Sequence, residues 1–561
     1  MVNRNTNHKM TMLLVGIAGQ DGDFLLSLAC LKCFLLQDGA ISDRLNIILS
    51  QHFFVPDDSI PGKTREILDQ IDSLKPEIVG FSCYVWNIHA VQCISDKIKR
   101  RHHNVKIIFG GPEIAKEDIA EGKCKAYCAD YLIFGEGEKP FRALLRNLLR
   151  IKSLNLSQIK GLAYWNEGNF SCNSDPDIIE DLKGIKSPYL EGILDDVMLH
   201  RKNIRINIET QRGCSFRCAY CFYHKNFSGI RYRDSQLVID EITYAHEKGI
   251  RKCRIVDANF LSNQSFAKTI ILGLISRRIE MTLFCEILPM HVNEEIAGLL
   301  GQFIGMHPNN QITVGMGIQT TTQEPLRIIR RSIPIEFFNR AFQRLQDQNM
   351  LIKTDVILGL PRETKETYFE AIEYICDKME KGNNSLSLAP LRVLPGTDMV
   401  EIGKAEKLTI DNRDSSHFVY ETPSMPRRDM LSCLRINAAA FRLLSSGISL
   451  KRKNIRDIYF RYKNHYKLNN IEMLEYFSEK FNQVLEETDA DYVKTDFPNA
   501  ETYYQRQIHK DIPDDVIITL FIQKWGFFLM AGYLLYIGRV FLIRYIRQRL
   551  SGIWEKLINF K

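Results

Sequence analysis

Two runs of alternating strand-like and helix-like segments constrain the fold of this 561-residue chain most. In the first run, over residues 11–150, short apolar segments alternate with amphipathic ones such as 62–74 and 88–101. The strand candidates are TMLLVGIAG, RLNIILS, PEIVGFSCYV, VKIIFGG and ADYLIFGEGE. This alternation is typical of a parallel, doubly wound sheet that binds ligands beyond the carboxyl ends of its strands. No GxGxxG or Walker loop follows a strand, which disfavours an ordinary dinucleotide or ATP site.

The second run begins near residue 205 and predicts a parallel barrel. Its strand candidates are IRINIET, RKCRIVDANF, MTLFCEI, QITVGMGIQ, IKTDVILGLP and SLSLAPLRVLPGT. Six βα units fall short of the eight that close a TIM barrel, so the pattern predicts a partial (β/α)6 barrel. In such folds the catalytic residues lie on the loops that follow the strands.

These patterns divide the α/β chain into four parts. We expect a flavodoxin/Rossmann-like domain over 8–150, a linker with a small strand pair over 151–200, the partial TIM-type barrel over 201–410 and a mainly helical region over 411–561. Within the last part, residues 525–538 are apolar, but this stretch is shorter than the ~20 residues that span a bilayer. It fits a buried helix or, with its basic flank, a peripheral membrane contact.

Charge and chain start bear on partners and location. The formal charge is +7, and most of it lies after residue 523, where seven Lys and Arg side chains face one Glu. A general nucleic-acid surface is therefore not supported. The polar start MVNRNTNHKM lacks the apolar segment of a secretory signal, so we expect a cytoplasmic protein, with membrane association at most at its C-terminus.

Three of the 14 cysteines stand apart from the rest, which are scattered in apolar runs. Cys214, Cys218 and Cys221 occupy one loop after the first strand of the second run, in the segment QRGCSFRCAYCFYHK. A thiol cluster in a reducing compartment points to metal. Structural zinc would need a fourth ligand, for which His224 is the candidate. A [4Fe–4S] cluster held by three cysteines would instead leave one iron open to a ligand.

The CxxxCxxC spacing with Tyr220 before the last cysteine resembles the signature of the radical S-adenosylmethionine (SAM) superfamily. VDANF, GIQTTTQEPL, DVILGLPRET and VLPGTDM, in this order, are similar to later segments of its six-unit barrel. The resemblance implies that the three cysteines hold a [4Fe–4S] cluster whose open iron binds SAM, and that an electron from an external donor cleaves SAM to a 5′-deoxyadenosyl radical.

The resemblance also implies a set of SAM contacts, by matching position. Tyr220 and Phe222 would lie near the adenine, and Asp257 and Asn259 near the methionyl amino group. Candidates for the ribose, the carboxylate and the adenine edge are Glu286, Gln319 and Gly359. Two alternatives remain open: Asp257 fits a helix N-cap, and Gly359 fits a turn.

The N-terminal domain resembles the cobalamin-binding domain of the B12-dependent radical SAM enzymes, through VGFSCYVWN, IIFGGPE and DYLIFGEGE. The histidine of the DxHxxG motif, which ligates cobalt in many other cobalamin proteins, is absent from GQDGDF. The resemblance implies that the corrin lies near Ser82, Tyr84, Val85, Trp86 and Asn87. It places the nucleotide tail near Gly110, Gly111 and Pro112, although the two glycines also fit a tight turn.

The two implied cofactors suggest a cobalamin-dependent radical SAM methyltransferase that methylates an unactivated carbon or phosphorus centre of a small molecule, peptide or lipid-like substrate. Relatives that use the radical for ring contraction or ring closure are the first alternative. A tRNA methylthiotransferase is disfavoured because three further cluster cysteines are lacking. A cobalamin or redox sensor without turnover is the alternative from another class, and no DNA-reading motif after residue 400 supports it.

Overall fold

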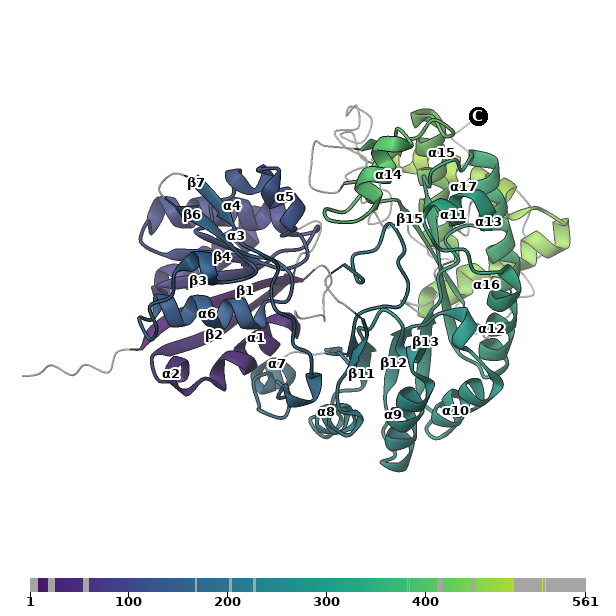
Figure 1. The fold of residues 1–561 in the computed structure, drawn as a ribbon. Helices are drawn as coiled ribbons and strands as arrows, with labels where there is room; N and C mark the ends of the chain where they lie inside the picture. Colours follow the sequence, from purple (N-terminus) through teal and green to yellow (C-terminus); the bar gives the residue numbers. More distant parts are fainter. Residues whose placement is uncertain are drawn as a thin grey trace, which may run out of the picture.

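The computed structural model describes residues 9–18, 26–53, 60–166, 169–200, 204–225, 229–380, 382, 384–410, 417–444, 450–488, 517 and 520. They form two α/β units that lie side by side, with the N-terminal unit in purple and blue and the second in teal and green (Figure 1). Both expected sheets are present.

The N-terminal sheet has the strand order β2-β1-β3-β4-β5-β6-β7. Its strands are β1 (Met10–Ala18), β2 (Leu45–Phe53), β3 (Ile78–Ser82), β4 (Lys106–Gly110), β5 (Tyr131–Ile133), β6 (Leu162–Asn166) and β7 (Asn169–Cys172). The first five are parallel and correspond to the five predicted strands. The pair expected near GLAYWNEGNFSC is β6 and β7, which are antiparallel and extend this sheet beyond residue 150.

Helices cover both faces of this sheet. They are α1 (Leu26–Leu36), α2 (Gly39–Ser42), α3 (Ile60–Leu74), α4 (Ile88–Arg101), α5 (Lys116–Ala120) and α6 (Glu138–Leu148). Alternate residues of β1 point to opposite faces: Leu13 packs in the core beneath α3 and α4, and Leu14 in the core beneath α1 and α6. Residues 12–18 of this strand are therefore buried and carry no polar side chain, as expected when both faces are covered.

The second sheet has six parallel strands in chain order, which confirms the partial barrel. They are β8 (Ile206–Ile208), β11 (Lys252–Ile255), β12 (Thr282–Glu286), β13 (Gln311–Gly315), β14 (Leu351–Leu358) and β15 (Ser385–Pro390). The connecting helices are α8 (Ser235–Glu247), α9 (Gln264–Ser276), α10 (Glu294–Gly305), α11 (Gln323–Ile328), α12 (Ile335–Asp347) and α13 (Lys365–Met379). Asn and Thr N-caps begin several of them, including Asn263, Asn293 and Thr364.

Helices also cover the β15 edge of the barrel. The elements after β15 are α14 (Met399–Ala405), β16 (Thr409–Ile410), β17 (Val419–Glu421), α15 (Arg427–Leu444), α16 (Leu450–Tyr466) and α17 (Asn470–Thr488). Helix α15 packs on β15, and Arg456 of α16 donates to the Asn384 carbonyl at 2.9 Å. The stretch 525–538 lies outside the described residues. In the part of the chain that is described, no helix has the length and apolar character needed to cross a membrane.

Candidate active site

The loop that carries the three cysteines follows β8, at the carboxyl edge of the barrel. A two-stranded ribbon of β9 (Gln211–Arg212) and β10 (Arg231–Tyr232) closes the base of this loop. Gly213 adopts φ +100°, and a Cβ there would lie 2.1 Å from the Gly229 carbonyl oxygen. Only glycine fits this crossing, which stands directly before Cys214.

The later half of the loop is anchored by the barrel. The Ala219 amide donates to the Ile329 carbonyl at 2.9 Å, and the Ala219 carbonyl accepts from the Met399 amide at 3.0 Å. The Tyr223 hydroxyl donates to the Val256 carbonyl at 2.7 Å. These bonds fix the backbone on both sides of Cys221.

All three cysteines line one cavity of about 280 Å³. This volume is close to the lower end of the roughly 300–1,000 Å³ typical of small-molecule sites. Four of the predicted SAM contacts line the same cavity: Tyr220, Asp257, Glu286 and Gln319. Residues separated by more than 100 positions in the sequence thus line one cavity. It lies at the carboxyl edge of the barrel, where the catalytic residues of such folds are found.

Three other predicted contacts do not line this cavity. The ring of Phe222 packs against Gly396. The Asn259 side chain is buried, accepts from the Leu288 amide at 3.1 Å and lies 2.9 Å from His291 Nδ1. Gly359 has φ +84°, with the Met430 Cε 2.9 Å from where its Cβ would be, so it serves a tight turn.

Asp257 is a buried residue that holds the start of the cysteine loop. Its Oδ1 accepts from the Thr210 amide at 2.8 Å and the Gln211 amide at 3.2 Å, and its Oδ2 accepts from the Thr210 hydroxyl. The helix N-cap alternative is therefore wrong, because these partners lie just before β9 and at its first residue, not in a helix. Burial raises the pKa of Asp257 to about 7, although the Thr210 and Gln211 bonds oppose this shift.

Several charged side chains that line the cavity were not predicted from the sequence. Arg331 Nη1 lies 3.8 Å from the Cys218 sulfur, and its guanidinium lies over the Phe216 ring at 5.3 Å. Arg254 and Asp355 also line the cavity. Burial, and then the charge of Asp355, raise the pKa of Glu286. Asp355 falls within the quoted segment DVILGLPRET, whereas Arg331 carries no local sequence signal.

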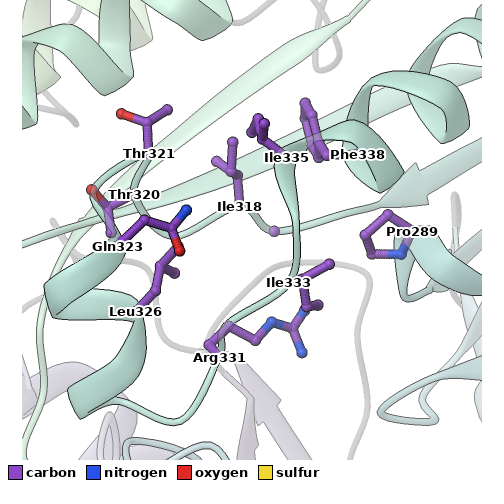
Figure 2. Close-up of a pocket in the computed structure, with 11 residues that line it drawn as sticks. Pro289, Ile318, Thr320, Thr321, Gln323, Leu326, Arg331, Ile333, Ile335 and Phe338 are labelled. Carbon is purple, nitrogen blue, oxygen red and sulfur yellow. The ribbon is translucent and has the colours of Figure 1, made fainter.

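Arg331 also borders a second, smaller cavity, shown in Figure 2. Apolar side chains such as Ile318, Ile333 and Phe338 line much of it, and its volume is about 20 Å³. This is little more than the ~15 Å³ that one water molecule requires. The smaller cavity therefore does not serve as a substrate pocket.

The predicted corrin contacts lie in the loop after β3, and only part of this loop is accessible. Trp86 is 45% exposed and stacks on Tyr84 with ring centroids 4.3 Å apart, and Val85 is half-buried. Ser82 and Asn87 are buried, and Asn87 donates to the carbonyls of Ile17 (3.0 Å) and Ser82 (2.9 Å). Tyr84, Val85 and Trp86 are thus the members of this group that can meet a ligand.

The loop after β4 contains the predicted contacts to the nucleotide tail. Gly111 has φ +116°, and a Cβ there would lie 2.5 Å from the Cys83 carbonyl oxygen, so this glycine serves a close backbone crossing. Gly110 is half-buried at the end of β4, and Pro112 is exposed.

This loop lies against the barrel. His417 Nε2 is 2.9 Å from Glu113 Oε1, and a Cβ on Gly396 would lie 3.0 Å from Glu117 Oε2 and 3.0 Å from the Phe222 ring. The residues after β4 therefore meet the residues after β15 and the end of the cysteine loop. The carboxyl edges of both sheets, where ligands bind in such folds, are brought together.

The donor set fits an iron–sulfur cluster held by three cysteines. Among the described residues that line the larger cavity there is no fourth cysteine and no histidine, so His224 is not brought to the thiols. Burial raises the pKa of Cys221 to about 11, so metal binding would have to displace its proton. In the described part of the chain, no three His, Cys, Asp or Glu side chains are close enough together to hold a single metal ion, whereas three cysteines that hold a cluster each bind a different iron and lie further apart.

Comparison with known protein families gives a match in each of the two α/β units. The family model of the radical SAM superfamily matches residues 208–375, and that of the B12 binding domain matches residues 53–145. The two matches contain all the predicted cobalamin contacts, the three cysteines and all the predicted SAM contacts.

Relatives with curated names match this chain over part of their length. The chain is 24% identical over 406 residues to the cobalamin-dependent radical SAM methyltransferase TokK of Streptomyces tokunonensis, covering 65% of this chain and 56% of TokK. It is 25% identical over 338 residues to the anaerobic magnesium-protoporphyrin IX monomethyl ester cyclase of Rubrivivax gelatinosus, covering 56% of each. The chain thus spans little more than half the length of these relatives.

Among solved structures, the cobalamin-dependent SAM radical enzyme OxsB, with aqua-cobalamin and SAM bound, aligns over 97% of this chain and 81% of its own, with a TM-score of 0.60 and 15% identity. At this identity the likeness concerns the fold. Residues 208–375 thus match the radical SAM superfamily and residues 53–145 the B12 binding domain, and the chain is similar to a cobalamin-dependent radical SAM methyltransferase.

Proposed function

We propose that this protein is a radical SAM enzyme in which Cys214, Cys218 and Cys221 hold a [4Fe–4S] cluster. The observation that carries the proposal is the single cavity that these thiols share with Asp257, Glu286 and Gln319. When bound, the cluster would supply the electron that cleaves SAM to a 5′-deoxyadenosyl radical. The chain would contribute soft thiol ligands and polar partners for SAM within one cavity.

Each cavity side chain has a chemistry that suits part of SAM. The carboxylates of Glu286 and Asp355 and the amide of Gln319 can hydrogen-bond hydroxyl and amino groups, and Tyr220 offers an aromatic face. The buried guanidinium of Arg331 can pair with a carboxylate beside Cys218. Asp257 would act through the backbone that it holds, since its two oxygens already accept from Thr210 and Gln211.

We further propose that the residues after β3 and β4 would hold cobalamin, which would supply the chemistry for methyl transfer from SAM to an unactivated carbon or phosphorus centre. The similarity to TokK and the B12 binding match support this assignment. Tyr84, Val85 and Trp86 would present a largely aromatic surface to the corrin, and Gly110, Gly111 and Pro112 would border the nucleotide tail. We infer a small-molecule substrate, with peptides and lipid-like molecules as the other classes to screen.

Anaerobic turnover with SAM carrying a labelled methyl group tests both proposals. After reconstitution with iron, sulfide and cobalamin, and with a chemical reductant, the protein should release 5′-deoxyadenosine, and label should appear in a methylated product. Release of 5′-deoxyadenosine with label absent from every product would defeat methyl transfer but keep the radical SAM assignment. Failure to consume SAM at all would favour a sensor.

A radical cyclisation or rearrangement without methyl transfer is the second candidate. The similarity to the cyclase of Rubrivivax gelatinosus favours it, since that relative matches over 338 residues. The same labelling experiment separates the two candidates, because a cyclase should convert its substrate and leave the labelled methyl group on methionine.

A further inference from the structure

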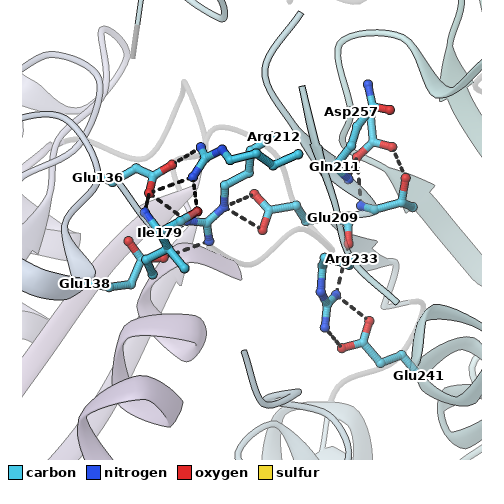
Figure 3. A network of polar contacts seen from close by, with 11 residues as sticks. Glu136, Glu138, Ile179, Glu209, Gln211, Arg212, Arg233, Glu241 and Asp257 are labelled. Atoms are coloured by element: carbon cyan, nitrogen blue, oxygen red, sulfur yellow. Dashed lines mark hydrogen bonds and ion pairs between the residues drawn. The ribbon is translucent and has the colours of Figure 1, made fainter. Parts of the chain in front are cut away.

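The segment Gly-Glu-Gly-Glu after β5, residues 135–138, belongs to the B12 binding domain but contacts the ribbon that closes the cysteine loop (Figure 3). Glu136 pairs with Arg231 of β10 through both of its oxygens, one at 3.3 Å. Glu138 Oε1 lies 2.7 Å from Arg212 Nη2 of β9. One glutamate therefore reaches each strand of the ribbon, across the boundary between the two domains.

This contact is buried, which distinguishes it from the surface ion pairs of the chain. The side chains of Glu136 and Glu138 are 5% and 9% exposed, and those of Arg212 and Arg231 are 8% and 10% exposed. Glu136 also accepts from the Ile179 amide at 3.0 Å, so the polypeptide that links the two domains is tied to the same point. Removing one carboxylate would leave a buried guanidinium with fewer charge partners, which is unfavourable, although Arg212 would keep Glu209 at 3.1 Å.

Only Gly213 separates the ribbon from Cys214, so the position of the ribbon constrains the position of this cysteine. Arg212 is followed by Gly213, whose tight crossing over Gly229 leaves no room for a Cβ, and then by Cys214. Cys218 and Cys221 are held instead by the bonds of Ala219 and Tyr223 to the barrel. The start of the cysteine loop is thus anchored by both domains, through Asp257 of the barrel and through Glu136 and Glu138, whereas its later half is anchored by the barrel.

We propose that Glu136 and Glu138 are positioning residues that hold Cys214 in register with the other two cysteines, so that the B12 binding domain is required for iron–sulfur cluster assembly independently of cobalamin. This inference rests on the proposed cluster ligands but not on methyl transfer. In this proposal, the segment 135–138 of the B12 binding domain positions a cysteine of the barrel domain.

The test compares full-length Glu136→Gln and Glu138→Gln with the wild type and with Asp177→Asn. Asp177 forms an exposed pair with Lys160 at 2.8 Å and serves as the matched control. The apoproteins are first compared by hydrogen–deuterium exchange. They are then reconstituted anaerobically with iron and sulfide, without cobalamin, and bound iron is measured per chain.

Exchange over residues 209–216 should rise in both glutamine variants and stay unchanged over 217–225, and bound iron should fall to less than about half of the wild-type value. Asp177→Asn should match the wild type. Wild-type iron content in both glutamine variants would overturn the proposal. If Glu136→Gln does not fold, Glu136→Asp, which keeps the charge and shortens its reach, should show the same local increase in exchange.

The variant Cys214→Ala distinguishes an error in the proposed cluster ligands from an error in the proposed positioning role. If this variant keeps its full iron content, the proposed cluster ligands are wrong. If it loses iron while Glu136→Gln and Glu138→Gln retain it, the ligands stand and the positioning role is wrong.

Discussion

Arg331 Nη1 lies 3.8 Å from the sulfur of Cys218, although 113 residues separate them in the sequence. Arg331 is buried, and its guanidinium also covers the Phe216 ring, so a fixed positive charge stands beside one of the proposed cluster ligands. A buried charge at this distance acts with little solvent screening.

We expect Arg331→Leu to retain its cluster but to lower the cluster's midpoint potential by tens of millivolts, because the positive charge stabilises the more negative reduced state. An anaerobic redox titration followed by electron paramagnetic resonance measures the shift. Arg327→Leu, which alters an exposed arginine on α11, is the control and should leave the potential unchanged. An unchanged potential in Arg331→Leu would show that Arg331 does not act on the cluster electrostatically.

Individual replacement of Cys214, Cys218 and Cys221 by alanine should abolish stable cluster incorporation, because each removes one of three thiol ligands. Iron and sulfide analysis after reconstitution measures this. His224→Ala should incorporate a full cluster, since His224 does not line the cavity of the thiols. Loss of metal from His224→Ala would revive the Cys₃His zinc alternative.

Asp257→Ala should destabilise the apoprotein by about 1–3 kcal/mol, because it leaves the buried amides of Thr210 and Gln211 without their shared acceptor. Asp257→Asn keeps one carbonyl oxygen and should lose less. Urea unfolding of both variants measures the difference. Equal stability of Asp257→Ala and the wild type would mean that Asp257 does not anchor the loop.

Glu363, fully buried after β14, should make stability depend on pH. Burial raises its pKa to about 8 from its ordinary value of 4.5, opposed by the Thr320 hydroxyl. The folded state thus holds a proton that the unfolded state releases, so this residue's contribution to the free energy of unfolding should fall as pH rises from about 5 to about 8.

Glu363→Gln removes this titration. Relative to the wild type, the variant should gain free energy of unfolding, by up to a few kcal/mol, between pH 5.5 and pH 8.5. Urea unfolding of both apoproteins at the two pH values provides the comparison. A difference between the two proteins that does not change with pH would contradict a raised pKa at Glu363.

The sequence alone determined the two sheets, since apolar strand runs alternating with amphipathic helices have few other ways to bury their surfaces. The cysteine spacing and the ordered barrel segments indicated the chemistry, because soft ligands within one loop depend on local sequence. The resemblance to the radical SAM superfamily implied that Tyr220, Asp257, Glu286 and Gln319 share the site, and in the structure all four line the cavity of the cysteines.

Tertiary structure decided the rest, because it depends on contacts between distant residues. Arg331 contacts Cys218 from a loop with no distinguishing motif. Asn259 does not line the cavity, because its side chain bonds to Leu288 and His291 instead. The pairing of Glu136 with Arg231 joins two domains whose relative placement no local pattern specifies. Local sequence therefore predicted the ligands of the site, and packing between the domains decided which residues surround the loop that carries them.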